Sequence, residues 1–280
     1  MLAIDPEKCI LAQTLKVSFV NKKGFANAEA TGSEAHECKL CLGTTYLPET
    51  DEQGYRRVRP CEGAITLKRL DLFNSAYVPA RYATASFESF KPRDQVERGQ
   101  VANLKKYLTS FEVGRLGRAF FGNAGTGKTH LLIAIIRYLT LDLAIACRYV
   151  EFTQLLFDIR SLYSENKPES SLINPLVEVP VLFVDELGKG RCNDFEIRII
   201  DEIITRRYNN PALTTFFASN YLPRNFVLSA KPTKKELEKY QGMEFLEDRI
   251  QFRSASRLHE ICQFIHLKGD DYRHRLQSLI

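Results

Sequence analysis

The chain has 280 residues, 44% hydrophobic and 26% charged, which is ordinary for a soluble globular protein of one large or two smaller domains. The net charge of +5 permits a nucleic-acid partner without demanding one. The longest apolar run, Leu131 to Ile136, ends at Arg137 and is too short to span a membrane. Asp5 and Glu7 lie where a signal peptide needs positive charge. With seven cysteines, these features predict a reducing, cytoplasmic compartment and no membrane partner.

Residues 1–75 are predicted to form a small zinc-ribbon-like domain. Cys38 and Cys41 form a C-x-x-C pair, and Cys61 follows after nineteen intervening residues. A C-x-x-C knuckle closed by a distant cysteine is typical of such zinc sites. Unrelated free cysteines remain an alternative, whereas a redox pair is disfavoured because no thioredoxin-like strand precedes it. The fourth ligand stays open among three candidates: His36, Cys9 and, as the weakest, Glu62.

Residues 76–114 are predicted to be a linker and adapter. The first part is aromatic and contains proline, which suits a segment packed on the edge of a domain. After Pro92, the stretch Gln95 to Phe111 places apolar residues near one face and is predicted to be a single helix. These residues are Val96, Val101, Leu104, Tyr107 and Leu108.

Residues 115–280 alternate strand and helix patterns, which predicts an α/β fold with a parallel sheet covered on both faces. Glu247 to Ile265 is predicted to be a helical stretch followed by a short strand. The helical part places Arg249, Arg253 and Arg257 four residues apart, so they are expected to share one face. The other strands are predicted at residues 117–121, 147–151, 180–185 and 214–219.

The segment FFGNAGTGKT, residues 120–129, fits the phosphate-binding pattern G-x-x-x-x-G-K-[S/T]. Its glycines let the backbone bend around an anion, with successive N–H groups directed at the phosphate. Lys128 adds a charge toward the β- and γ-phosphates, and the Thr129 hydroxyl can ligate Mg²⁺. An apolar strand before the segment and a helix after it make a chance glycine-rich turn improbable. The predicted ATP-binding residues are Gly122, Asn123, Ala124, Gly125, Thr126, Gly127, Lys128, Thr129 and His130.

Two further strands end in polar side chains. The stretch 180–186 is a buried strand that ends in Asp185 and Glu186, at the sheet edge where the phosphate loop is also expected. Asp185 is predicted to hold Mg²⁺ through water, and Glu186 to polarise the attacking water. Asn220 ends the strand at 214–219 and is predicted to orient that water. The alternatives are an ordinary acidic turn and a turn-forming asparagine.

Four segments in this order resemble the DnaC/DnaI-type helicase loaders and the related IstB-type transposition ATPases, both of the AAA+ class of P-loop ATPases. They are FFGNAGTGKTHL, VLFVDELG, DEIITRRYNN…TTFFASNYLP and SRLHEICQFIHLKGDDYR, and the resemblance covers roughly residues 76–280. It implies Walker A and Walker B roles for the residues above, and sensor 1 for Asn220. It also implies that Arg257 is an arginine finger reaching a neighbouring subunit, and that Arg273 is sensor 2. The cysteine module resembles that of DnaI-type loaders but lacks the final C-x-C.

The resemblance implies a Mg²⁺-dependent ATPase that assembles with itself, binds single-stranded DNA and loads or remodels a replicative helicase. The segment 152–163, with Arg160 and Tyr163, occupies the place of the family's extra helix that touches single-stranded DNA. Core packing is an equal alternative for its apolar positions. The rival function is a transposition helper that assembles on DNA and recruits a transposase. A small-molecule kinase is disfavoured by the adjacent acids, Asn220 and the arginine helix.

Overall fold

The structure is a computed structural model that describes residues 16–31, 41, 44, 46–228 and 233–272. The chain divides into two compact units. The smaller unit contains Met1–Thr84 and Ile136–Ala146, and the larger contains Ala85–Ile135 and Cys147–Ile280. The domain boundaries predicted at residues 75 and 114 stay predictions. Within the described ranges, no helix has the length and apolar character that crossing a membrane requires.

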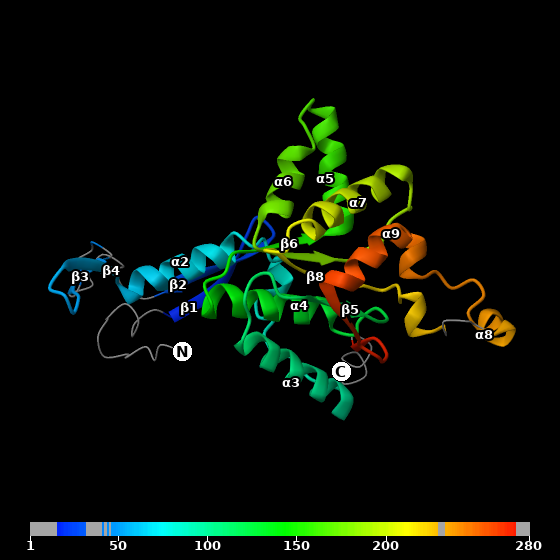
Figure 1. Cartoon of the computed structure of the whole chain (residues 1–280), viewed down its shortest axis with the longest axis horizontal. Coiled ribbons are helices and arrows are strands. Elements are labelled where there is room, and N and C mark those ends of the chain that lie inside the picture. The colour runs from blue at the N-terminus through cyan, green and yellow to red at the C-terminus, as the bar shows by residue number, and fades with distance from the viewer. Residues whose placement is uncertain (1–15, 32–40, 42–43, 45, 229–232, 273–280) are drawn as a thin grey trace. The chain divides into compact units, whose positions relative to one another are not determined.

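Five parallel strands form the sheet of the larger unit, in the spatial order β6-β7-β8-β5-β9 (Figure 1). Four of them occur within one residue of the predicted positions, and β9 closes the predicted stretch Glu247 to Ile265 and extends one residue past it. The prediction of an α/β fold with a parallel sheet is therefore confirmed. The strands are β5 (Gly117–Phe121), β6 (Cys147–Glu151), β7 (Val181–Asp185), β8 (Thr214–Ser219) and β9 (Cys262–His266).

Helices cover both faces of this sheet: α3 and α4 lie on one face, and α5, α7 and α9 on the other (Figure 1). Every residue of β7 and β8 is buried, as their near-continuous apolar sequences require. The rings of Phe183 and Phe216 stack between these strands with centroids 4.8 Å apart. The helical elements are α3 (Gln95–Thr109), α4 (Lys128–Arg137), α5 (Phe152–Ser164), α6 (Ser170–Glu178), α7 (Asp194–Tyr208), η3 (Arg224–Phe226), α8 (Lys234–Lys239) and α9 (Leu246–Ile261).

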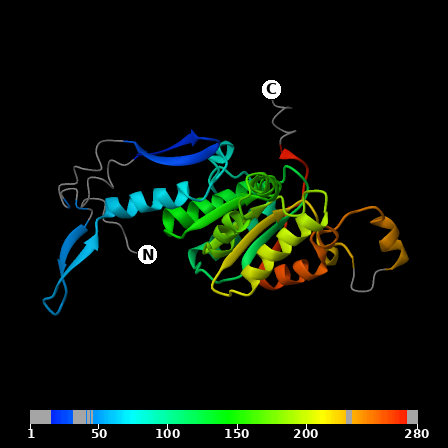
Figure 2. The same ribbon diagram turned by 90° about the horizontal axis from the view of Figure 1, so that it is seen from above.

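The smaller unit contains two antiparallel hairpins and one long helix. The first hairpin turns through Lys23 and Gly24, both with positive φ, as tight two-residue hairpin turns require. The Asn74 amide at the end of the helix bonds both the N–H and the C=O of Ala28, which ties α2 to β2 (Figure 2). The elements are β1 (Lys16–Lys22), β2 (Phe25–Thr31), β3 (Tyr46–Thr50), β4 (Arg56–Pro60), α2 (Glu62–Asn74), η1 (Ala80–Tyr82) and η2 (Tyr138–Asp142).

Candidate active site

The loop between β5 and α4 has the backbone that phosphate binding needs. Gly122 and Gly127 have φ angles of 142° and 90°, in the region that favours glycine. A Cβ on Gly127 would lie 2.7 Å from Cε2 of Phe90, and one on Gly122 would overlap the carbonyl oxygen of Leu267. Because α4 begins at Lys128, the N–H groups of its first turn face the loop and favour an anion there. A side chain at either glycine position would therefore force its neighbour or the loop to shift.

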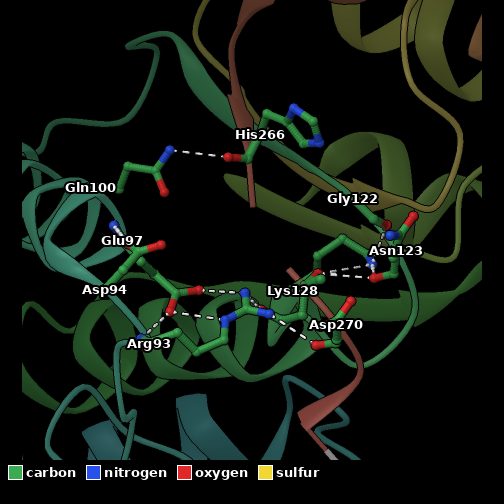
Figure 3. A network of polar contacts seen from close by, with 10 residues as sticks. Arg93, Asp94, Glu97, Gln100, Gly122, Asn123, Lys128, His266 and Asp270 are labelled. Atoms are coloured by element: carbon green, nitrogen blue, oxygen red, sulfur yellow. Dashed lines mark hydrogen bonds and ion pairs between the residues drawn. The ribbon is translucent and has the colours of Figure 1, made fainter. Parts of the chain in front are cut away.

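The Lys128 ammonium already lies within the loop. Its Nζ donates to the carbonyl oxygens of Gly122 at 2.8 Å and Asn123 at 2.7 Å, and the residue is only 8% exposed (Figure 3). Phosphate oxygens carry full charge and are stronger acceptors than these carbonyls. Phosphate oxygens can therefore replace these carbonyls as acceptors of the Lys128 ammonium, which the loop already positions.

Asp185 and Thr129, the two predicted magnesium ligands, are in direct contact. The Thr129 hydroxyl donates to Oδ2 of Asp185 at 2.6 Å, and the Tyr149 hydroxyl donates to the same oxygen at 3.0 Å. Burial raises the pKa of Asp185, and these hydrogen bonds oppose that shift. Carboxylate and hydroxyl oxygens side by side next to a phosphate loop suit Mg²⁺, which prefers oxygen ligands.

Glu186 directly follows Asp185 and lies in a strained turn, with a φ angle of 55°. Its carboxylate forms an ion pair with Lys189 at 2.6 Å. The neighbouring Glu151 pairs in register with Asp185 at the end of β6. Burial first, and then the hydrogen bond and repulsion from Glu186, raise the pKa of Glu151. Sequence reasoning missed Lys189 and Glu151, although the strand at residues 147–151, which ends in Glu151, was predicted.

The end of β8 is tied to the turn that carries Glu186. The Ser219 hydroxyl donates to the carbonyl of Leu187 at 2.7 Å, and the Leu187 N–H donates to the carbonyl of Ala218 at 2.9 Å. These bonds place Asn220 beside the acidic turn with its side chain exposed. Its role in orienting water stays a prediction.

The three arginines expected to share one face of α9 do not share it. Gln251 has φ 66° and ψ 153°, so the helix is interrupted there. Arg249, before the break, is buried, whereas Arg253, after it, is exposed. The prediction of one arginine face is therefore wrong, because it assumed an unbroken helix.

Arg257 packs against α7 within its own chain. Its Nη1 lies 3.1 Å from Oδ1 of Asp201 and also donates to the hydroxyl of Thr205. The Arg257 side chain is 16% exposed. The assignment of Arg257 as an arginine finger stays a prediction. The ion pair with Asp201 offers an alternative, structural role for the same side chain. Arg273, the predicted sensor 2, lies outside the described residues.

Comparison with known proteins identifies relatives, although no family model matches the chain. The replicative helicase loader DnaC of Buchnera aphidicola subsp. Baizongia pistaciae (strain Bp) is 31% identical over 135 residues, which are 48% of this chain. The match spans about half of that relative, 54% of its length. DnaC of Escherichia coli (strain K12) is 25% identical over 167 residues, covering 59% of this chain and 68% of the relative.

A crystal structure of the DnaC helicase loader matches the fold with a TM-score of 0.53 and 25% identity, over 67% of this chain and 99% of that one. Over about half its length, this chain is a distant homologue of the DnaC/DnaI replicative helicase loaders, a family of AAA+ ATPases. The resemblance read from the four motifs is thereby confirmed. The parallel sheet of the larger unit matches the AAA+ core of that DnaC structure.

This core has a network that the family motifs did not reveal (Figure 3). Arg93, just before α3, donates to the carbonyl of Thr126 in the phosphate loop and to the carbonyl of Asp270 after β9, both at 3.1 Å. Glu97 holds the same guanidinium through an ion pair at 2.6 Å. In the sequence, the spacing of Asp94 and Glu97 marks a helix start, but nothing there links Arg93 to the loop.

The cysteine module is only partly within the described residues, since Cys38, His36 and Cys9 lie outside them. Cys41 and Cys61 are both buried, at 5% and 0% exposed. They lie before β3 and directly after β4, and the register pairs Tyr46 with Pro60, so both cysteines adjoin the same end of this hairpin. Among the described residues, no group of three histidines, cysteines or acids is placed to hold a metal.

Helix α5 takes the place that the loader resemblance gives to a DNA-contacting helix. Phe157 on this helix is 64% exposed. Arg160 forms an ion pair with Glu196 at 3.0 Å, and the Tyr163 hydroxyl donates to Glu169. Arg160 and Tyr163 therefore have partners within the chain, although the Tyr163 ring is 46% exposed, and Phe157 is a further exposed ring on this helix.

Proposed function

We propose that this chain is an ATPase that assembles with itself on DNA and loads or remodels a replicative helicase. The observation that carries the ATPase part is the meeting of Lys128, Thr129 and Asp185 at the ends of β5 and β7. A phosphate cradle, a fixed ammonium and two oxygen ligands are what a Mg-nucleotide requires. The remaining part is supported by relatives that carry the name replicative helicase loader.

The chain's own residues suggest how the site acts. Thr129 and Asp185 would hold Mg²⁺, which would neutralise charge on the phosphates. Lys128 moves from loop carbonyls to phosphate oxygens when ATP enters. Glu186 would polarise the attacking water with a carboxylate that also pairs with Lys189 at 2.6 Å. Arg257 is proposed to complete the site of a neighbouring subunit, and Arg273 is proposed to complete the site of its own subunit.

The helicase proposal is tested by what the chain recruits to single-stranded DNA. The full chain, with ATP, should place the hexameric replicative helicase of its own organism onto a DNA circle coated with single-strand-binding protein. Loading should fall with ADP and with rising salt, because aligned basic contacts to phosphates release counterions. A chain that never stimulates loading, but retains a transposase on duplex DNA, belongs to the rival class. Loading by Phe157→Ala, compared with the exposed control Phe25→Ala, reports whether α5 contributes to helicase loading on single-stranded DNA.

Zinc in the cysteine module is proposed from buried Cys41 and Cys61 at one end of the β3–β4 hairpin. About one zinc per chain should copurify. Structural zinc of this type contributes about 10–16 kcal/mol of apparent binding energy, which becomes folding energy. Cys38→Ser should therefore unfold the N-terminal part and leave the ATPase core folded.

Elemental analysis of protein purified without chelator measures the metal, and limited proteolysis locates the unfolded part. Cys192→Ser is the matched control, because Cys192 lies in the larger unit, far along the chain from the module. A metal content near zero in the wild type would overturn the zinc proposal.

A further inference from the structure

Two successive carbonyls of the phosphate loop each accept a hydrogen bond from outside the loop. The carbonyl of Gly125 accepts from the Tyr272 N–H, and the carbonyl of Thr126 accepts from Arg93 Nη2, both at 3.1 Å. In a planar trans peptide the C=O and the following N–H point in opposite directions. Holding these two oxygens outward therefore directs the N–H groups of Thr126 and Gly127 to the other side, where such a loop receives its anion.

Arg93 acts on both of these bonds, and Figure 3 shows its contact with Asp270. Arg93 itself donates the hydrogen bond to the carbonyl of Thr126. Arg93 also supports the bond from the Tyr272 N–H to the carbonyl of Gly125. Its Nη1 donates to the carbonyl of Asp270, two residues before Tyr272, at 3.1 Å. Gln100 adds a second tie between α3 and the same segment, from its Nε2 to the carbonyl of His266 at 3.0 Å. The chain from His266, the last residue of β9, to Asp270 is thus held at two points: by Gln100 of α3, and by Arg93 just before α3, which also contacts the loop.

The guanidinium itself is fixed. Glu97 accepts from Arg93 Nη2 at 2.6 Å and Nε at 3.2 Å, and from the Arg93 backbone N–H at 2.6 Å. The Asp94 side chain in turn accepts from the Glu97 N–H at 2.7 Å. The side chains of Arg93 and Glu97 are only 9% and 5% exposed. A paired, nearly buried arginine has one geometry, unlike Arg98, which is exposed on the same helix.

We propose that Arg93 is a positioning residue of the nucleotide site, which presets the phosphate loop by anchoring the outward carbonyls of Gly125 and Thr126. The proposal rests on the ATP site proposed above and assigns a role to a residue outside its sequence motif. A donor on a peptide carbonyl also polarises the peptide and strengthens its N–H as a donor. Arg93 therefore favours phosphate binding without touching the phosphate.

The expected consequence is a defect in binding rather than in chemistry. The N–H groups meet the phosphates before and during the reaction, so their misplacement should raise KM and leave kcat nearly unchanged. One poorly aimed hydrogen bond to a charged group corresponds to about a tenfold to hundredfold loss of affinity. Arg93→Gln should show this loss in full. Arg93→Lys keeps the charge beside Glu97 but has no fork for two carbonyls, so it should fold normally and still bind weakly.

The experiment measures binding of a fluorescent ATP analogue, the steady-state kcat and KM, and thermal unfolding with and without ATP, all on the full chain. Arg98→Gln is the matched control and should equal the wild type. In the Arg93 variants, ATP should raise the melting temperature less than in the wild type at the same concentration. If Arg93→Gln does not fold, Arg93→Lys decides by the same measurements.

A folded Arg93 variant with ATP affinity and KM within about twofold of the wild type overturns the inference, as does an equal defect in Arg98→Gln. A variant that lowers kcat with an unchanged KM also overturns it, since that pattern places Arg93 in the chemical step. A wild-type chain that binds no ATP removes the proposed function itself, and this inference with it. The two failures are therefore distinct.

Discussion

Glu186→Gln should give a protein that binds ATP normally but hydrolyses it about 10²–10⁴-fold more slowly, as is typical when a general base is lost. Glutamine keeps the shape of the side chain, so the strained turn at φ 55° is retained. It cannot take a proton from water, however, and it cannot pair with Lys189 as a charge. Single-turnover hydrolysis and nucleotide binding, measured on the same preparation, separate the two effects.

Lys128→Ala is the contrasting variant. It should lose ATP binding, because the ammonium that Gly122 and Asn123 now hold is the charge that meets the phosphates. Glu165→Gln, an exposed carboxylate beyond α5, is the matched control and should change neither quantity. Full turnover by Glu186→Gln would show that another residue activates the water, and the neighbouring Glu151 would be the first to examine.

The sheet and its phosphate loop could be predicted because their signals are local. Buried parallel strands appear in a sequence as apolar runs. A strand that ends in Asp185 places this carboxylate at the carboxyl edge of the sheet, where ligands bind. The contact between Thr129 and Asp185 follows from this topology, since Asp185 ends β7 and Thr129 lies in the first turn of α4, which the phosphate loop joins to β5. Residue type and spacing were sufficient there without any knowledge of the folded chain.

The network around Arg93 could not be predicted in this way. Arg93 meets Asp270 across 177 positions of the sequence, and its bonds to Asp270 and to Thr126 go to backbone carbonyls, which every residue possesses. The break in α9 was hidden for a different reason. The non-helical Gln251 lies between Arg249, which bonds the carbonyl of Gly188, and Arg257, which pairs with Asp201, and no glycine or proline marks it. Such features come from tertiary contacts that override local preference.

Arg257→Ala should bind ATP almost normally and hydrolyse it about 10³–10⁵-fold more slowly, if this arginine completes a neighbouring subunit's site. A guanidinium fork can hold two oxygens of the transferring phosphoryl group, where negative charge develops. Arg257→Lys should rescue poorly, since lysine offers a point charge without a fork. The exposed Arg253, four residues earlier on the same helix, is the matched control.

The ion pair between Arg257 and Asp201 offers a competing explanation of any such defect, because its loss would loosen α9 from α7. Asp201→Asn separates the two. It removes the ion pair and leaves Arg257 intact, so it should shift thermal unfolding about as much as Arg257→Ala while hydrolysis continues. Equal losses of activity in both variants would make Arg257 a structural residue of its own chain.

Mixing two inactive variants then decides whether the arginine acts between subunits. Arg257→Ala keeps Lys128, and Lys128→Ala keeps Arg257, so an interface that pairs the first variant's loop with the second variant's arginine is complete. Some hydrolysis should return on mixing, whereas neither variant alone should recover at the same total concentration. A mixture that co-assembles yet stays inactive would mean that Arg257 does not act in trans. Its bond to Asp201 would then be its function, and the subunit contact would need another arginine.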